Sequence, residues 1–470
     1  MEDKTMKKTV FGIATLLLAL SACNKIETID QPVGMADGIP FSATVSLGDN
    51  AATKALAESG DAITATWAEG EKVALIHGGV SDEMTVGSVS GGSATITGTI
   101  TGSPADGESV TIIYPASAAD GTTGNIKADL LYAQNGLLTG TGSISEKYDA
   151  RKGTGTLKVD GTATLDGSVA LTNQFAIFKF TVRGADGTTV ISAKPLTITI
   201  GEQDYVITPA TATDVLYAAL PAVSDEKVSF DATDGSDKTY TCAKLSVSFD
   251  SGKYYQSTLK MREYVDLGIT VDGKKVKWAT CNVGASKPTE YGDYFAWGET
   301  AAKTDYSWAT YKWMQSGQSD WKHITKYTSA DGQKEGIWYD GDTFIGDNKT
   351  VLDFEDDAAR ANWGGGWRMP TDAEMQALLA LETKDWVTDY EGSGINGFKF
   401  TGNGKTLFLP AAGLRGGSSF GNAGSSGYYW SSSLSELFSD SARCVGFDSE
   451  GVRRSGNKRY GGFSVRPVSE

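Results

Sequence analysis

The chain has 470 residues, 40% of them hydrophobic and 21% charged, so it can bury several cores and need not be disordered. At roughly 100–200 residues per domain, this length corresponds to about two to four domains. The formal net charge of −16 argues against nucleic acid as a partner and against an electrostatic hold on anionic lipid. The two histidines, His77 and His323, are far apart in sequence, which leaves little room for histidine-based metal sites or catalytic triads.

The N-terminus has the features of a bacterial export signal. A short basic start at residues 6–8 precedes an apolar run at residues 10–20, which is shorter than the roughly 20 apolar residues of a membrane-spanning helix. Leu-Ser-Ala-Cys stands at residues 20–23 and resembles the lipobox of bacterial lipoproteins. The resemblance implies cleavage between Ala22 and Cys23 and acylation of the Cys23 thiol, which would anchor the chain in a lipid bilayer. The alternative is an ordinary secretory signal with an accidental cysteine.

The chain from residue 39 to about residue 260 has the pattern of β-sandwiches. Short runs rich in Val, Ile, Thr and Phe alternate with turns of Gly, Asp and Ser. Strict alternation at residues 196–200 predicts a strand with one buried face, and the nearly all-apolar residues 174–182 predict a strand that crosses a core. Residues 245–249 and 253–261 flank a turn and predict a β-hairpin.

The composition changes sharply at residue 263. Of the eleven tryptophans, only Trp67 precedes this point, so we expect a domain boundary here. Beyond it, Thr371 and Glu374 fit a capping box, and apolar residues follow at helical spacing, which predicts a helix from Asp372 to about Leu381. The expected organisation is a signal peptide at 1–22, a flexible polar tether at 23–38, β-sandwiches at 39–170 and 171–262, and a domain of strands and helix at 263–470.

Four short motifs in the first part of the chain share one resemblance; they are Ile39–Ala43, Trp67–Val73, Val110–Pro115 and Gly252–Tyr255. Together they resemble the fimbrillin-like lipoproteins of Bacteroidales. The resemblance implies paired β-sandwiches that assemble with other fimbrillin-type subunits into a type V pilus or a related surface fibre. In that family a protease cuts after an Arg or Lys beyond the first strand, and Lys54, followed by Ala55, stands at the matching position.

Such a cut would remove the strand predicted at residues 39–47 and expose unpaired backbone groups. A strand donated by another subunit could then pair with them. The alternative is that Lys54 is an ordinary loop lysine.

Seven motifs in the last region share a second resemblance; they are Tyr264–Gly268, Trp278–Ala285, Tyr291–Thr300, Asp356–Ala359, Trp363–Thr371, Tyr429–Ser433 and Ser464–Val468. Together they resemble the Fibrobacter paralogous domain family, which is similar in fold to C-type lectins and to formylglycine-generating enzymes. The expected fold class is therefore mainly β, with tandem fimbrillin-like β-sandwiches followed by an α+β C-type-lectin-like domain.

No motif indicates catalysis, and we expect the protein not to be an enzyme. The sequence contains no phosphate-binding loop, no zinc-protease motif and no close pair of cysteines. Cys281 and Cys444 fall in the same region and could form a disulfide, which would leave Cys242 free. The alternative is that these cysteines are buried, unreacted thiols.

Aromatic residues crowd one stretch of the last region and could stack on sugars or anchor a protein partner. The alternative is that they form the core of a domain with little regular structure. Trp363 and Trp367, which flank glycines ahead of the predicted helix, are expected to be structural. The crowded residues are Tyr291, Tyr294, Phe295, Trp297, Tyr306, Trp308, Tyr311, Trp313 and Trp321.

Clustered carboxylates after residue 339 could hold a structural calcium ion, and no other cofactor is expected. The spacing departs from the EF-hand pattern, because Phe344 stands where an oxygen ligand belongs. Asp356 and Asp357 could instead favour the start of a short helix. The candidate ligands are Asp340, Asp342, Asp347, Asp356 and Asp357.

These features together predict a lipid-anchored protein of the outer membrane and cell surface. The leading hypothesis is a fimbrial tip subunit or adhesin whose lectin-like head binds a host or dietary glycan or a matrix protein. A tip position is expected because the sequence ends with the head's own strand at residues 464–468 and has no further strand to donate. The alternative is a monomeric outer-membrane glycan-binding lipoprotein that serves nutrient capture.

Overall fold

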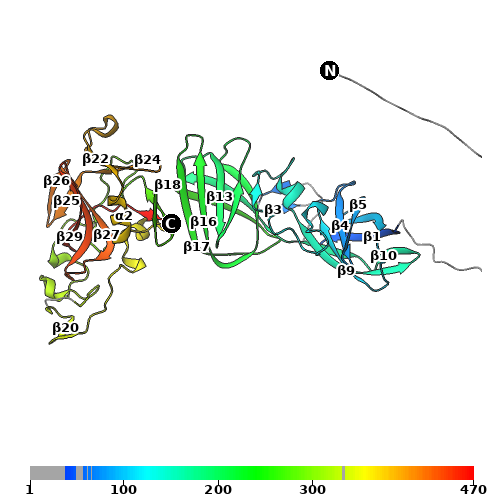
Figure 1. The fold of residues 1–470 in the computed structure, drawn as a ribbon, viewed down its shortest axis with the longest axis horizontal. Helices are drawn as coiled ribbons and strands as arrows, with labels where there is room; N and C mark the ends of the chain where they lie inside the picture. Colours follow the sequence, from blue (N-terminus) through cyan, green and yellow to red (C-terminus); the bar gives the residue numbers. More distant parts are fainter. Residues whose placement is uncertain (1–37, 49–56, 61, 65, 331–333) are drawn as a thin grey trace, which may run out of the picture.

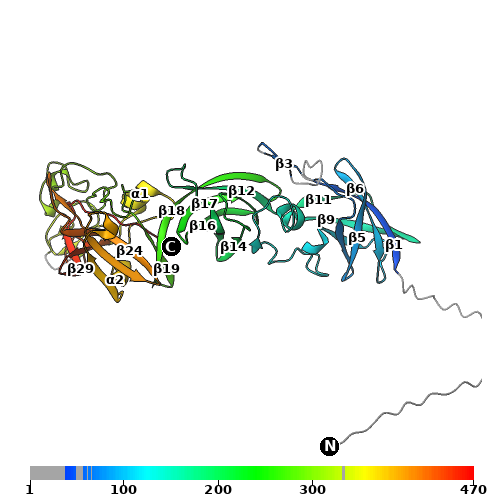
Figure 2. The same cartoon turned by 90° about the horizontal axis from the view of Figure 1, so that it is seen from above.

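The computed structural model describes residues 38–48, 57–60, 62–64, 66–330 and 334–470. Three units follow one another along an elongated molecule (Figures 1 and 2). The mainly β fold class is confirmed, since within the described ranges only two short α-helices occur and both lie in the third unit. None of the described helices has the length and apolar character needed to span a membrane.

The first unit is a closed barrel. Its strand order is β10-β1-β11-β9-β7-β4-β5-β6, and β1 also pairs with β6, so the sheet closes on itself. Alternate side chains such as Val45, Val73 and Ile112 fill the interior. The strands are β1 (Ile39–Leu47), β4 (Lys72–His77), β5 (Val80–Ser90), β6 (Ser93–Ile100), β7 (Ser109–Tyr114), β9 (Arg151–Asp160), β10 (Thr162–Leu165) and β11 (Val169–Asn173), with a separate hairpin of β2 (Ala57–Ser59) and β3 (Ala62–Thr64).

The second unit is a sheet folded over so that its two halves pack face to face. Its order is β15-β12-β18-β17-β16-β13-β14-β8. The rings of Phe180 on β12 and Phe230 on β16 lie 5.4 Å apart, although β18 and β17 separate these strands in the sheet. The strands are β8 (Ala133–Gln134), β12 (Ala176–Gly184), β13 (Ala193–Ile200), β14 (Gln203–Ile207), β15 (Val215–Leu220), β16 (Val223–Asp234), β17 (Thr239–Phe249) and β18 (Tyr254–Val271).

Part of the region expected in the first sandwich belongs to this second core. Leu131, Ile144 and Tyr148 pack among the buried residues of the second unit, and β8 pairs with β14. The apolar segment predicted to cross a core is β12, with Phe178 and Val182 buried. The long connection between β7 and β9 therefore joins the two units by side-chain packing.

The hairpin predicted between residues 245–249 and 253–261 is wrong, because β17 pairs with β18 only far from the turn, at residues 239–241 and 262–264. Closer to the turn, β18 leaves β17 and pairs in parallel with β12. This change of partner brings the ring of Tyr255 to 5.0 Å from that of Phe178, where the two stack. Core packing against β12 thus replaces the hairpin ladder.

Strand β18 continues without a break into the third unit. Its second half pairs with β19 (Lys274–Ala279), from Tyr264 opposite Ala279 onward. The boundary expected between residues 262 and 263 therefore falls inside a strand. The strand β30 (Val468–Ser469) pairs with β19 beside this junction (Figure 1). The second and third units meet through a continuous strand and not through a flexible linker.

The third unit contains a five-stranded sheet of order β26-β25-β27-β28-β29, a three-stranded sheet of order β22-β23-β24, and two α-helices. The predicted helix is confirmed as α2 (Asp372–Leu379), and Thr371 and Glu374 form the expected capping box. Its Met375 and Leu378 pack in one core with Trp278.

The remaining elements of the third unit are short. They are α1 (Ala358–Trp363), β20 (Tyr339–Asp340), β21 (Thr343–Phe344), β22 (Thr383–Val387), β23 (Gly397–Gly402), β24 (Lys405–Pro410), β25 (Ala412–Gly416), β26 (Ser419–Ala423), β27 (Ser426–Leu434), β28 (Ser441–Asp448) and β29 (Gly451–Lys458). Single helical turns lie at η1 (Ala116–Ala118), η2 (Ile144–Tyr148), η3 (Trp308–Thr310), η4 (Trp321–His323), η5 (Phe354–Asp356) and η6 (Tyr390–Gly392).

Candidate functional site

Strand β1 closes the barrel and lies between strands on both of its edges. Residues 39–46 pair antiparallel with β6 on one edge, and on the other edge Phe41 pairs in parallel with β10 and Val45 with β11. Phe41, Ala43 and Val45 are buried, and the residues between them are exposed. One strand therefore completes two backbone ladders and part of the barrel core.

Four predicted site residues lie outside the described residues. They are Ala22 and Cys23 at the expected lipidation site and Lys54 and Ala55 at the expected processing site. Their assignments stay predictions.

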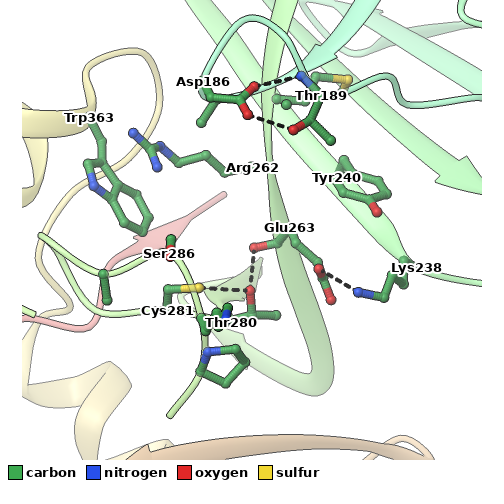
Figure 3. A pocket seen from close by; sticks show the side chains of 16 residues that line it. Asp186, Thr189, Lys238, Tyr240, Arg262, Glu263, Thr280, Cys281, Ser286 and Trp363 are labelled. Carbon is green, nitrogen blue, oxygen red and sulfur yellow. Dashed lines mark hydrogen bonds and ion pairs between the residues drawn. The ribbon is translucent and has the colours of Figure 1, made fainter. Parts of the chain in front are cut away.

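A cleft of about 580 Å³ opens at the junction of the second and third units. Its walls come from the turn after β12, the start of β17, the middle of β18, the loop after β19 and the end of α1 (Figure 3). Both units contribute because β18 crosses the junction. Junctions between domains are a preferred location for ligand sites.

Arg262 on β18 extends its side chain toward Trp363 at the end of α1 (Figure 3). The guanidinium carbon lies 3.9 Å from the centroid of the indole ring, a cation–π arrangement. Within the part of the chain that the structure describes, this guanidinium has no hydrogen-bonded acceptor and no carboxylate partner. Burial lowers the pKa of Arg262 from its ordinary value, because a half-buried cation loses hydration.

The two carboxylates of the cleft already have partners. Glu263 accepts a hydrogen bond from Lys238 Nζ at 3.0 Å. Asp186 accepts one from the amide of Thr189 at 2.8 Å and another from its hydroxyl at 2.5 Å (Figure 3). Neither carboxylate is paired with Arg262, so the guanidinium remains available to an anion from outside.

Cys281 and Cys444 do not form the disulfide that the sequence allowed as one possibility: both thiols are free, as is that of Cys242. Cys281 lines the cleft with its sulfur 3.6 Å from the Thr280 hydroxyl, whereas Cys444 is buried in β28 with its sulfur 3.3 Å from Asn457 Nδ2. Burial raises the pKa of Cys281, and it raises that of Cys444 to about 11 and that of Cys242 to about 12. These thiols resist ionisation and are not activated nucleophiles.

The acidic residues proposed as calcium ligands do not converge on one point. Asp342 forms an ion pair with Lys334 at 3.0 Å, and Asp357 caps helix α1, as its alternative interpretation predicted. Asp347 accepts two backbone amides of a neighbouring loop, and Asp340 is exposed. The proposed set of five therefore does not form a calcium site.

Only Asp356 of that set joins a compact acidic group, together with Asp353 and Glu355. Lys326 Nζ lies 2.7 Å from carboxylate oxygens of both Asp353 and Asp356, and Lys312 Nζ lies 2.7 Å from the other oxygen of Asp356. The positive charge beside these carboxylates thus comes from lysine side chains of the chain itself. The arrangement is a structural ion-pair network.

Because of this ion-pair network, we expect the third unit to be less stable at acidic pH. Burial alone would raise the pKa of Asp356, but hydrogen bonds from Lys312, Lys326 and Tyr327 outweigh it, and the pKa lies below its ordinary value. A carboxyl with a lowered folded-state pKa stabilises the fold above its unfolded pKa, and this contribution is lost as the pH falls toward the folded value. We expect the unfolding free energy of the third unit to decline below about pH 5.

Asp356→Asn is expected to destabilise the third unit by about 2 kcal/mol at pH 7 and to make the acid decline shallower. Urea unfolding at a series of pH values measures both effects. Asp340→Asn, at an exposed aspartate, is the matched control and should leave the pH profile unchanged. An Asp356→Asn profile that overlays the wild-type profile would contradict the prediction.

The crowded aromatic residues of the third unit belong mainly to its core. Of the nine, Tyr294, Phe295, Trp297, Tyr306 and Tyr311 are buried, and the others are half-buried. The interpretation as core is therefore favoured over that of a sugar-stacking surface. Trp367 is buried as expected, whereas Trp363 is half-buried and lines the cleft.

Comparison with known proteins gives no family assignment. No protein-family model and no curated protein matches the chain. The chain is similar to a solved fimbrial assembly protein from Parabacteroides distasonis, with 12% identity over 48% of this chain and 94% of that chain and a TM-score of 0.28. It is also similar to a fimbrial protein from Bacteroides ovatus, with 14% identity over 92% of this chain and 99% of that chain and a TM-score of 0.23. Similarity this low carries no weight for function, and the resemblance of the third unit to the Fibrobacter paralogous domain stays a prediction.

Sequence reasoning missed the cleft. Arg262 lies at the edge of an expected domain boundary, and Trp363 was assigned a purely structural role. The two are far apart in the chain, and only the continuation of β18 and the path of α1 bring them together. No local pattern signals such an encounter.

Proposed function

We propose that this chain is a cell-surface adhesin of the fimbrial type. It is exported as a lipoprotein of the outer membrane, anchored through acylated Cys23. Cleavage after Lys54 then removes the anchor together with β1, and the processed chain assembles with other fimbrillin-type subunits by accepting a donated strand in place of β1. Its binding surface lies on the third unit. The observation that carries the proposal is the position of β1, which completes the barrel between two other edges. No catalytic step is included in the proposal.

Removing β1 would leave an open slot in the barrel that another β-strand could fill. The slot would expose the backbone groups of β6 on one side and those of β10 and β11 on the other. It would also expose the pockets of Phe41 and Val45, whose burial contributes about 1.5–3 kcal/mol each. A strand from another subunit with the same alternation of apolar residues could fill the slot by β-augmentation.

The elongated shape determines which end of the molecule would face the next subunit in such an assembly. The barrel lies at one end of the long axis and the third unit at the other, with the second unit between them (Figure 1). A contact made through the β1 slot therefore leaves the third unit at the far end, where it is free to meet a glycan or a matrix protein. This supports the tip or adhesin role.

Identification of the mature N-terminus by mass spectrometry tests the proposal in cells that carry the protein. We expect processed chains that begin at Ala55 in assembled material. Lys54→Ala should lower the amount of chains that begin at Ala55 at least tenfold. Lys54→Arg, which keeps a basic residue before the cut, should leave that amount unchanged. A lipidated Cys23 on every copy in the assembled fraction would overturn strand exchange.

A second candidate function is a monomeric glycan-binding lipoprotein of the outer membrane. The closed barrel favours it, because with β1 in its own barrel the strand already pairs on both edges without a partner. Under this alternative the Lys54→Ala chain and the wild-type chain have the same N-terminus at Cys23.

A further inference from the structure

The cleft between the second and third units holds a cation that has no counterion among the residues that the structure describes. The Arg262 guanidinium is half-buried, stacked on Trp363 at 3.9 Å, and has no acceptor among the described residues. A desolvated cation is costly unless an anion or good acceptors compensate it. A planar guanidinium offers paired N–H donors that match a carboxylate in a bidentate arrangement.

The cleft is larger than a simple ion would need, and its walls carry several hydroxyl groups. Its volume of about 580 Å³ falls in the range of pockets for small organic ligands, about 300–1,000 Å³. The hydroxyl groups of Thr189, Thr280, Ser286 and Tyr240 line it, and hydroxyl oxygens can accept hydrogen bonds even where their protons are already donated. These groups suit the hydroxyls of a sugar ring.

The charges in the cleft disfavour a densely charged ligand. Lys238, Arg262 and Lys287 face the two carboxylates of Asp186 and Glu263, so the lining carries a net charge of +1 (three cations and two anions), which matches one carboxylate better than a dianionic phosphate ester. A ligand with a single carboxylate and a neutral, hydroxyl-rich body meets Arg262 with its charge and keeps the remainder of its surface uncharged. Lys287 at the loop after β19 adds positive charge, although the chain as a whole is acidic.

We infer that this cleft binds a carboxylated sugar of the hexuronate type, with Arg262 receiving the carboxylate and the hydroxyl-bearing walls receiving the ring. The site draws on two units at once, and a bound sugar would tie them together at the junction. The inference does not depend on strand exchange, so the outcome at Lys54 and the outcome here are separate.

Calorimetric titration of the full chain with D-galacturonate tests the inference. D-galactose is the matched neutral sugar, and acetate is the matched carboxylate without a sugar body. We expect saturable binding of galacturonate that is at least tenfold tighter than that of either control. No saturable binding, or equal binding of galactose or acetate, would overturn the inference.

Variants of two stacked arginines assign the effect to the cleft. Arg262→Gln should weaken galacturonate binding at least tenfold. Arg360→Gln is the matched control, since its guanidinium stacks on the ring of Phe354 at 3.8 Å outside the cleft, and it should change binding less than twofold. Binding that Arg262→Gln leaves intact would place the sugar elsewhere and reject the site.

A measurement on the wild-type chain covers the case in which Arg262→Gln fails to fold. Cys281 lines the cleft, whereas Cys444 is buried in β28 and should stay unlabelled in the native chain with or without the sugar, which makes it the internal control for unfolding. Saturating galacturonate should slow maleimide labelling of Cys281 at least threefold at pH 8.5 and leave that of Cys444 unchanged. Unchanged labelling of Cys281 would contradict occupation of the cleft.

Discussion

Arg459→Ala is expected to lower the unfolding free energy of the third unit by about 4 kcal/mol, because it leaves several buried acceptors without a donor and removes a large buried side chain. The Arg459 side chain is fully buried. It donates to the carbonyls of Lys326, Tyr327 and Ser439 and to the hydroxyl of Tyr311. The substitution leaves these acceptors without a donor and opens a large cavity.

Loss of the Arg459 side chain should loosen several loops at once, because this one side chain bonds to segments that have little regular structure of their own. The guanidinium also lies 4.9 Å from the ring of Trp297, so tryptophan fluorescence during urea unfolding reports the change. Arg453→Ala is the matched control: its side chain is 58% exposed and pairs with Asp448, so the expected change is within about 0.5 kcal/mol. An Arg459→Ala protein within 1 kcal/mol of wild type would refute the role of Arg459 in joining these loops.

The features that sequence alone predicted are those set by neighbours in the chain. Helix α2 begins where Thr371 and Glu374 cap each other, which requires residues only three positions apart. The strands with strict alternation, such as β13, were predicted for the same reason, since one face of a strand is set by period two.

The features that sequence missed depend on encounters between distant segments. Closure of the barrel requires Ile39 of β1 to lie opposite Ile100 of β6. The sequence of neither strand predicts that the two strands pair. The change of partner along β18 is similarly a result of packing against β12. The expected boundary at residue 263 followed from composition, but a change in composition does not require the backbone to leave a strand.

The candidate sites divide in the same way. The acidic loop suggested calcium because carboxylates were visible in sequence, while the lysines that neutralise Asp356 lie earlier in the chain and are brought in by folding. Cys281 and Cys444 share a region but lie at the cleft and in the core, which spacing cannot distinguish. Arg262 became a candidate only because the structure shows no carboxylate beside it among the described residues.

Val45→Asp in β1 is expected to destabilise the barrel by about 4–5 kcal/mol, because it introduces a carboxylate at a fully buried position. Val45 lies opposite Ala94 of β6 and Val169 of β11. Relief of the buried charge requires β1 to leave the barrel, so both ladders should open together. Hydrogen exchange should show lost protection of the amides in β6 and β11, and the protection of the second and third units should stay unchanged.

Thr44→Asp is the control on the same strand, since Thr44 is exposed and the charge remains in water. A synthetic peptide of residues 39–47 should restore protection to β6 and β11 in the Val45→Asp chain, because it supplies the same alternating side chains to the vacated slot. The same peptide carrying the Val45→Asp change should not. If the Val45→Asp chain keeps wild-type protection in both strands, β1 is not the strand that holds the barrel closed, and replacement of β1 by a donated strand loses its physical basis.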